Sequence, residues 1–390
     1  MQSIHGKGLA AVAAVAMAGS VGTVQADTKV GVLLPYSGVF AALGQEIDDG
    51  FVFALEEAGR EGEFTLIRED TEVRPPEGLA KARKLVLQDE VDLIMGVVSS
   101  GVLAALRDFV TDAEVPLLVA NAGEDSSTGE NCSPYVIRVS FSNSQVNRPM
   151  GQWLYDQGKR RVYTLAPDYA AGQQMIATFT AAFEEAGGEI VGAEFTPFGR
   201  TQDFGPYITN ARAADPDAVF VFYAGSEAIA FVRQYDSFGM KEDIPLFGSG
   251  FLTSPLYVGA QGEAAIGVIA SLHYVPTIDT PENTEFVEAF RERFDRMPSE
   301  YAVQGYDAGQ VLMRALDAGA DDRASLAREM AQVSYTGPRG PLEIDPATNN
   351  IIQNIYVYDT VSDGEGGLTQ EVLDVIERVQ DEPMGCTLGQ

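Results

Sequence analysis

Histidine is nearly absent from this 390-residue chain, which contains two. His5 lies in an N-terminal segment that we expect to be cleaved, so a Ser-His-Asp triad or a histidine-based metal site would depend on His273 alone. His273 lies in a strand-like stretch, where a structural role is expected. The two cysteines lack metal-ligand spacing, and no Gly-x-Ser-x-Gly, P-loop or Gly-x-Gly-x-x-Gly pattern occurs. The sequence therefore predicts no enzymatic activity, no cofactor and no metal.

Basic residues are also scarce, because 26 Lys and Arg stand against 57 Asp and Glu, for a formal net charge of −31. This balance disfavours nucleic acid and anionic lipid surfaces as partners. The acidic residues are spread along the chain, which is typical of a solvated surface. A carboxylate pair of the glycosidase type is the weaker, enzymatic alternative. Its candidates follow predicted strands and are Glu124, Asp125, Asp168 and Glu227.

Long hydrophobic runs are missing as well. Residues 9–18 are apolar, follow Lys7 and precede small residues up to Ala26, which predicts a secretory signal over residues 1–26. This stretch is too short to span a membrane, and no later segment offers about 18 uninterrupted apolar residues. Both cysteines, Cys132 and Cys386, lie in the part that would be exported, where a disulfide between them is expected. Two buried free thiols are the alternative.

Strands, loops and helices alternate along the first part of the chain. Apolar, β-branched strands are predicted near residues 29–34, 64–70, 91–98 and 115–120. Apolar residues at helical spacing predict helices over residues 45–58, 76–88 and 102–110. Such a βαβ series forms a parallel sheet whose strand-to-helix loops share one edge, where open α/β sheets bind ligands.

The pattern begins again after residue 142, with a helix over residues 146–157. Further strands end near residues 167, 224 and 248, and another covers residues 266–275. Helices are expected over residues 284–294 and 299–319, and a hairpin with a glycine-rich turn at residues 363–367 follows. We therefore expect an α/β protein with two doubly wound parallel-sheet lobes and no flexible linker.

Two neighbouring strand ends in the first lobe offer a site for an anion. Ser99 and Ser100 precede a predicted helix, whose free N–H groups and positive dipole end favour a carboxylate. Asn121, Ala122 and Gly123 follow the next strand, and the glycine lets the backbone approach a ligand closely. The alternative for the two serines is an ordinary helix cap that faces water.

Several of these segments resemble the leucine/isoleucine/valine-binding family of solute-binding proteins of ABC importers. Residues 29–44 resemble the opening strand and Ser-Gly loop of that family, and residues 96–100 resemble its carboxylate-holding loop. Four further motifs are similar to the branch that often takes up aromatic carboxylates: Asn121-Ala-Gly, Cys132-Ser-Pro-Tyr, Ala166-Pro-Asp-Tyr-Ala-Ala-Gly and Tyr301-Ala-Val-Gln-Gly-Tyr-Asp-Ala.

The resemblance implies a type I periplasmic binding protein, with a ligand cleft between two lobes joined by three crossovers near residues 143, 272 and 345. Lobe 1 would comprise residues 27–142 and 272–344, and lobe 2 residues 143–271 and 345–390. It also implies a periplasmic, monomeric protein that delivers a small carboxylate to a membrane permease. A ligand-sensing protein of a signalling receptor would have the same sequence features.

In family members that bind amino acids, a serine that matches Ser100 holds the carboxylate, while a threonine and a glutamate hold the ammonium. Here the threonine position falls at Gly123 and the glutamate position near Gly250, which favours an aromatic carboxylate over an amino acid. Glu124 or Glu227 could replace them, so a branched-chain or other hydrophobic amino acid, or an amide, stays the alternative. The expected ligand-binding residues are Ser99, Ser100, Asn121, Ala122, Gly123, Tyr169, Ser226, Phe251, Tyr301 and Tyr306.

Overall fold

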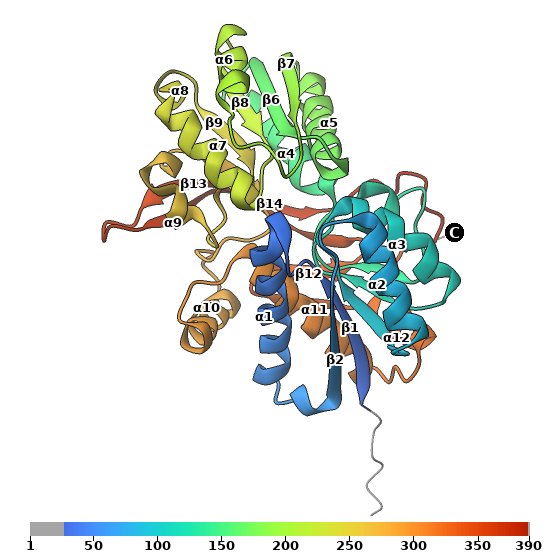
Figure 1. Ribbon diagram of the computed structural model, residues 1–390. Coiled ribbons are helices and arrows are strands. Elements are labelled where there is room, and N and C mark those ends of the chain that lie inside the picture. Colours follow the sequence, from blue (N-terminus) through green and yellow to red (C-terminus); the bar gives the residue numbers. More distant parts are fainter. Residues whose placement is uncertain (1–26, 389–390) are drawn as a thin grey trace, which may run out of the picture.

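The first of two α/β lobes is built on a five-stranded parallel sheet (Figure 1). The structure is a computed structural model and describes residues 27–388, so the expected signal segment lies outside the described residues. The strand order is β2-β1-β3-β4-β5. The bounds are β1 Thr28–Leu34, β2 Phe64–Asp70, β3 Leu93–Gly96, β4 Leu117–Val119 and β5 Val136–Arg138.

Helices cover both faces of this sheet. They are α1 Ala41–Glu57, α2 Pro75–Leu87, α3 Ser100–Asp112, α10 Pro281–Phe294, α11 Glu300–Asp317 and α12 Arg323–Met330. Two glycines allow α1 and α11 to pack unusually closely, because a Cβ at Gly50 would lie 1.9 Å from the Ala302 carbonyl oxygen, and one at Gly305 would lie 1.9 Å from that of Ile47. The C-terminal helices therefore pack beside the first helix of the chain.

The second sheet is mixed and has nine strands, with the path β11-β12-β13-β10-β9-β8-β6-β7 and β14 paired to β13, and most of it belongs to the second lobe. Its parallel strands are β6 Arg161–Pro167, β7 Glu189–Thr196, β8 Ala218–Val221, β9 Leu246–Ser249 and β10 Ile269–Leu272. Its helices are α4 Asn143–Asp156, α5 Ala170–Glu185, α6 Gly205–Ala213, α7 Gly225–Ser237, α8 Met240–Asp243 and α9 Val258–Gln261. Short 3-10 turns are η1 Gly38–Phe40, η2 Glu61–Glu63, η3 Asp125–Ser127, η4 Gly250–Thr253 and η5 Gly262–Ala265.

This second sheet differs from the expectation of a parallel sheet at its C-terminal strands, which are antiparallel. They are β11 Ser334–Gly337, β12 Gly340–Ile344, β13 Ile351–Ser362 and β14 Leu368–Val379. The hairpin of β13 and β14 was expected, whereas β11 and β12 were not. Both missed strands are short, and β12 joins β13 through two residue pairs only, so their local sequence gives a weak strand pattern. The expected two-lobed α/β fold is otherwise confirmed.

A fully buried arginine links several of these elements. The guanidinium of Arg339, between β11 and β12, forms an ion pair with Asp307 of α11 and donates to the carbonyl oxygens of Val139 and Ser140, which follow β5. It also donates to the side chain of Gln353 on β13. Because a buried charge is tolerated only when it is paired and fully hydrogen-bonded, these contacts fix the three segments relative to one another.

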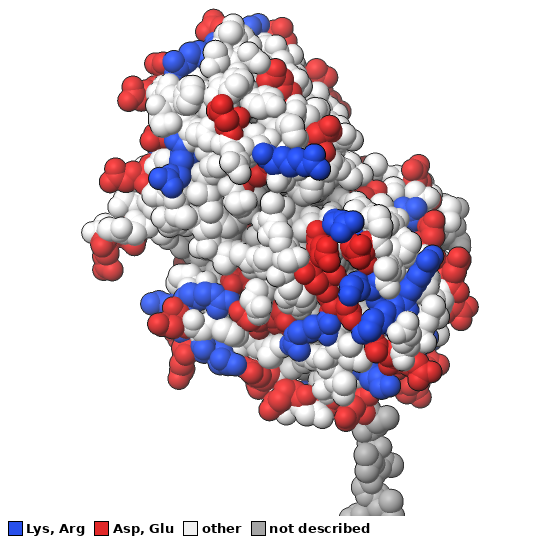
Figure 2. All heavy atoms as spheres, viewed as in Figure 1, with Lys and Arg blue, Asp and Glu red and all other residues white. Residues whose placement is uncertain are grey.

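Charged side chains of both signs are interleaved on the molecular face around α1 and α2 (Figure 2). Several basic side chains there are paired, as Lys81 and Lys84 are with Glu69, and Arg68 is with Asp48. This face therefore presents no extended positive field to a polyanion. Over residues 27–388, no helix is long and apolar enough to cross a membrane.

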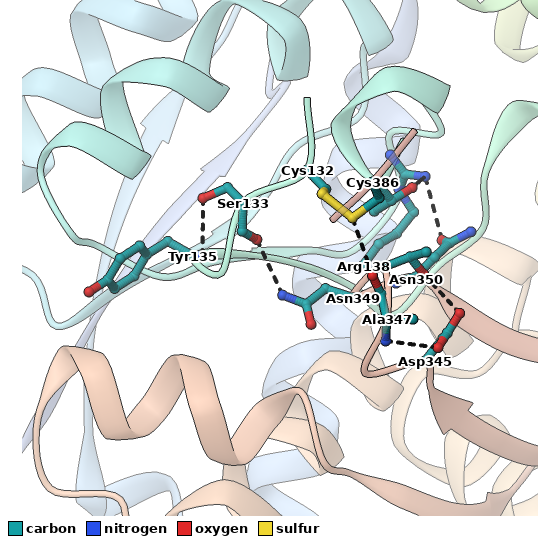
Figure 3. Close-up of a disulfide and its surroundings, with 11 residues drawn as sticks. Cys132, Ser133, Tyr135, Arg138, Asp345, Ala347, Asn349, Asn350 and Cys386 are labelled. Carbon is teal, nitrogen blue, oxygen red and sulfur yellow. Dashed lines mark hydrogen bonds between the residues drawn. A yellow bond between two sulfur atoms is a disulfide. The ribbon is translucent and has the colours of Figure 1, made fainter. Parts of the chain in front are cut away.

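A disulfide ties the C-terminal tail to the first lobe (Figure 3). Cys132 and Cys386 are joined with a Cα–Cα distance of 5.5 Å and are separated by 254 positions in the sequence. The Cys386 Sγ lies 3.3 Å from the carbonyl oxygen of Ala347, just before β13. This is the pairing expected from export and from the even cysteine count.

Glu300, the first residue of α11, is buried against the second lobe. Its Oε2 accepts a hydrogen bond of 2.8 Å from the hydroxyl of Ser254, which follows η4. Burial raises the pKa of Glu300 to about 8, partly offset by the hydrogen bond from Ser254. The carboxyl group is therefore mostly protonated in the fold at neutral pH.

The disulfide gives the first prediction. Without reductant, we expect intact-mass analysis of the alkylated, denatured protein to detect no free thiols, and after reduction to detect two. The Cys132→Ser and Cys386→Ser double variant should lose up to about 5 kcal/mol of stability in the chain-entropy account, because the bridge closes a very long loop. Two alkylatable thiols in the unreduced protein would contradict the bridge.

Glu300 gives the second prediction. Its pKa is higher in the fold than the ordinary 4.5 of an unfolded chain, so its favourable contribution to stability is complete below about pH 4.5 and is lost as the pH rises to about 8. The melting temperature of the wild type should therefore fall more steeply between pH 5 and 8 than that of Glu300→Gln, whose amide stays neutral. The corresponding difference in the free energy of unfolding should reach a few kcal/mol at most, since one pKa unit corresponds to about 1.4 kcal/mol. Parallel pH profiles of the two proteins would refute this effect.

Candidate functional site

A cavity lies where the strand ends of the two sheets meet. The first lobe contributes residues that follow β3, β4 and β5, and the second contributes residues that follow β6, β8 and β9. The lining residues are Phe40, Leu43, Val98, Ser100, Asn121, Gly123, Phe141, Asn143, Tyr169, Ala171, Met175, Phe222, Ala224, Phe251 and Tyr301. This is the edge at which open α/β sheets bind ligands.

The cavity is narrow and mostly apolar. It contains about 310 Å³ of space between atoms. The lobes touch beside it, with the rings of Phe40 and Phe198 5.6 Å apart.

Ser100, the first residue of α3, provides the polar side of the cavity. Its hydroxyl accepts a 3.2 Å hydrogen bond from Nδ2 of Asn143, which also donates to Gln174 of α5 at 2.6 Å. The Oδ1 of Asn143 is buried and has no hydrogen-bond partner among the described residues. The start of a 13-residue helix adds free N–H groups and a positive dipole end. The Ser100 hydroxyl and the helix N–H groups can donate hydrogen bonds to a carboxylate, whereas the Asn143 oxygen can only accept one.

Asn121 lies beside this polar side of the cavity, and a series of hydrogen-bonded side chains fixes its position. Its Nδ2 donates to the Oε1 of Gln304 at 2.7 Å, and the Nε2 of Gln304 lies 3.1 Å from the Nε2 of His273. His273 is fully buried, and burial, with the charge of Arg339, lowers its pKa well below the ordinary value. It is a neutral structural residue, as the sequence suggested. No group of three or more His, Cys, Asp or Glu suited to a metal occurs within residues 27–388.

Gly123 and Gly250 lie at or near the positions where the resemblance to amino-acid binders would place the ammonium ligands. A Cβ at Gly123 would lie 2.4 Å from Oδ1 of Asn143 and 2.6 Å from the ring of Phe141. A Cβ at Gly250 would lie 2.4 Å from the Cβ of Leu272. The neighbouring side chains therefore fill the space that a threonine or a glutamate would need.

The two acidic residues that could replace them are engaged elsewhere. Glu124 caps η3, where its carboxylate accepts hydrogen bonds from Ser126 and Ser127. Burial raises its pKa, but the hydrogen bonds from Ser127 and Ser126 outweigh burial and hold the pKa below the ordinary value. Glu227 is buried, and its pKa is raised by burial, while its carboxylate accepts from the backbone N–H of Thr201 at 3.4 Å. The lining residues in the described part of the chain are all uncharged.

Aromatic rings form most of the remaining wall. Phe251 packs against Phe141, Phe222 and Tyr301, with centroid distances of 5.1, 6.1 and 5.9 Å. Tyr169 stacks on Phe198 at 4.1 Å, with the ring planes 12° apart. Such a wall can enclose an aromatic ring by stacking and edge contacts.

The structure brings six of the expected site residues to the cavity: Ser100, Asn121, Gly123, Tyr169, Phe251 and Tyr301. Ser99 and Ala122 are buried next to it without lining it, and Ser226 is exposed at the start of α7. Tyr306 lies elsewhere, with its hydroxyl on Glu57 and its ring on Phe53 and Phe286. Five residues beyond Tyr301, it is turned roughly 140° around α11.

Sequence reasoning missed several lining residues, chiefly Phe141, Asn143 and Phe222. Phe141 and Asn143 follow β5. This strand has only three residues, so its sequence gives no clear strand pattern and no sign that another strand ends at this edge. Phe222 directly follows β8 within an apolar run. The place of Phe222 at a strand end could have identified it, because most of the other expected site residues follow strands in the same way.

Comparison with known proteins identifies the family. The family model described as periplasmic binding protein matches residues 27–365. Leu/Ile/Val-binding protein homolog 6 of Brucella melitensis is 31% identical over 364 residues, which cover 90% of this chain and 92% of that protein.

Solved structures agree with that match. An ABC transporter substrate-binding protein from Sphaerobacter thermophilus is 36% identical, with a TM-score of 0.86 over 91% of this chain and 99% of its own. An ABC transporter solute-binding protein from R. palustris, in complex with benzoate, is 33% identical, with a TM-score of 0.86 over 92% and 99% of the two chains. The chain belongs to the periplasmic binding protein family and has the type I fold of the Leu/Ile/Val-binding proteins.

Proposed function

We propose that this protein is the substrate-binding component of an ABC importer and that its ligand is an aromatic monocarboxylate. The cavity itself is the main support, because one helix start with Ser100 faces a wall of rings, and the described lining is uncharged. A benzoate-like ligand needs one anion-binding group and an apolar, ring-lined space. The R. palustris protein, which was crystallised with benzoate, supports the same ligand class.

The lack of a charged ammonium acceptor in the cavity lining distinguishes this ligand from an amino acid. A buried ammonium group costs several kcal/mol unless acceptors surround it. Gly123 and Gly250 leave no space for such side chains, and Glu124 is saturated by its own hydrogen bonds. The match to a Leu/Ile/Val-binding protein homolog favours an amino acid, which is therefore the second candidate.

The protein would act by capture and release without chemical change. We infer that lobe 1, residues 27–142 and 272–344, and lobe 2, residues 143–271 and 345–390, close on the ligand and present it to a membrane permease. The protein would be exported by the segment 1–26 and work in the periplasm as a monomer. The contacts of Arg339 support this division, because they join residues of the two inferred lobes close to the point where the chain crosses between them.

The ligand class can be tested by thermal shift. Benzoate and hydroxybenzoates should raise the melting temperature with concentration, because a ligand that binds only the folded state stabilises it. Leucine and valine should have little effect, and every bound compound should be recovered unchanged. Strong stabilisation by leucine, with none by aromatic acids, would establish the amino-acid alternative instead.

The role of Ser100 can be tested by substitution. Ser100→Ala should weaken benzoate binding by about 1 to 3 kcal/mol, the usual effect of losing a hydrogen bond to a charged group. Ser226→Ala is the matched control, because Ser226 also begins a helix but is exposed outside the cavity. Isothermal titration calorimetry should show unchanged affinity for the control. Equal affinities of the two variants would remove Ser100 from the site.

A further inference from the structure

Three buried side chains form a hydrogen-bonded relay that runs from the cavity wall to the end of β10. Asn121 lines the cavity, and its Nδ2 lies 2.7 Å from Oε1 of Gln304. The Nε2 of Gln304, on α11, lies 3.1 Å from Nε2 of His273, which directly follows β10. All three side chains are at most 5% exposed. In a buried series of this kind, the hydrogen bonding of one group determines the orientation of the next.

This relay has two arrangements that keep every hydrogen bond. His273 is neutral, because burial and the charge of Arg339 hold its pKa well below the ordinary value, so one ring nitrogen carries a proton and the other accepts. With the proton on Nδ1, Gln304 donates to Nε2 of His273 and accepts from Nδ2 of Asn121, whose Oδ1 is left for a ligand. With the proton on Nε2, both amides turn over and Nδ2 of Asn121 is left for the ligand. Nδ1 has no partner within residues 27–388, so neither arrangement gains a hydrogen bond there.

The ligand can decide between the two arrangements, because Asn121 lies next to the carboxylate-binding side of the cavity. Its segment and the one that leads to Ser100 continue side by side beyond the paired strands β4 and β3, with a hydrogen bond from Ala122 N–H to the Val97 carbonyl oxygen. A carboxylate only accepts hydrogen bonds, so it is bound by an amide NH2 group and repelled by an amide oxygen. A bound carboxylate therefore favours the arrangement with the proton on Nε2 of His273.

We propose that Gln304 and His273 are positioning residues that turn the amide NH2 group of Asn121 toward the bound carboxylate. In the complex, Nε2 of His273 donates to Oε1 of Gln304, and Nε2 of Gln304 donates to Oδ1 of Asn121. This inference rests on the proposed function and adds one donor to those of Ser100 and the start of α3. The relay supplies this donor without placing a second charge in the interior, where a charge is costly.

The position of the proton in His273 can be read by nitrogen NMR of the imidazole ring. The chain has one other histidine, so a His5→Gln variant with isotope-labelled histidine shows the ring of His273 alone. Couplings to the two ring carbon-bound protons identify each nitrogen. The benzoate complex should carry the proton on Nε2, and a proton on Nδ1 in that complex would overturn the proposal. Packing alone would not move this signature.

Isothermal titration calorimetry with benzoate tests the two amides. Asn121→Ala removes the donor and Gln304→Met removes the group that orients it, so each should weaken binding about tenfold, in line with one hydrogen bond to a charged group. The double variant should bind no more weakly than Asn121→Ala, because Gln304 acts through Asn121. Gln310→Met is the matched control, since Gln310 is also on α11 but bonds Arg314 away from the cavity, and it should bind as the wild type does.

Two substitutions separate positioning by His273 from its packing. The ring of His273 stacks on Phe141, with the planes 16° apart. His273→Phe keeps a ring there but removes the donor, and it should lose affinity as Gln304→Met does. His273→Gln restores an amide that can donate to Gln304, and its affinity for benzoate should stay within about threefold of the wild type. Equal losses in the two variants would assign His273 to packing and overturn its part in the proposal.

The results also distinguish this inference from the proposed function. If neither benzoate nor a hydroxybenzoate binds the wild type, the proposed function itself fails. If benzoate does not bind but a hydroxybenzoate does, the hydroxybenzoate replaces it in every arm. If the wild type binds its probe while Gln304→Met binds it equally well, or weakens binding further in the Asn121→Ala background, the relay does not position Asn121 and the inference is overturned.

Discussion

The buried ion pair between Arg339 and Asp307 is the contact through which the end of the first sheet, helix α11 and strand β13 are joined. Both side chains are fully buried, and the remaining guanidinium donors reach the backbone after β5 and the side chain of Gln353. Loss of either partner would leave an unpaired charge in the interior, which typically costs about 3 to 5 kcal/mol. The end of the first sheet, helix α11 and strand β13 are therefore held together at this point of the interior.

The ligand class of the proposed site depends less on which binding groups are present than on how side chains pack around two glycines. Ser100 and the start of α3 can hold a carboxylate in any member of such a family. In the proposed site, the selectivity comes from Gly123 and Gly250, because Phe141, Asn143 and Leu272 fill the space that side chains at these two positions would need. The same fold could then exclude one ligand class without a new charged contact.

Much of the fold could be predicted because the sequence obeys simple periods. Buried parallel strands and amphipathic helices follow the expected patterns, and parallel strands bring Ser100, Asn121, Tyr169 and Phe251 to one edge. The rest depends on long-range contacts. The antiparallel strands β11 and β12 form because they pair with each other and β12 pairs with β13. The sequence around Arg339 gives no sign that its side chain is buried and links several elements. The structure places Tyr306 outside the cavity because helical periodicity puts residues 301 and 306 on different faces of α11.

The buried polar side chains are satisfied to different degrees. Buried side chains such as Gln304, Gln353 and Arg339 are hydrogen-bonded within the fold. By contrast, Oδ1 of Asn143 is buried in the cavity wall and has no partner among the described residues. An unpaired buried acceptor weakens a fold, so a bound molecule that donates a hydrogen bond to it would recover part of that loss. A ligand shifts the equilibrium between two arrangements of a protein only by what it binds differently in each, and a contact of this kind is one source of such a difference.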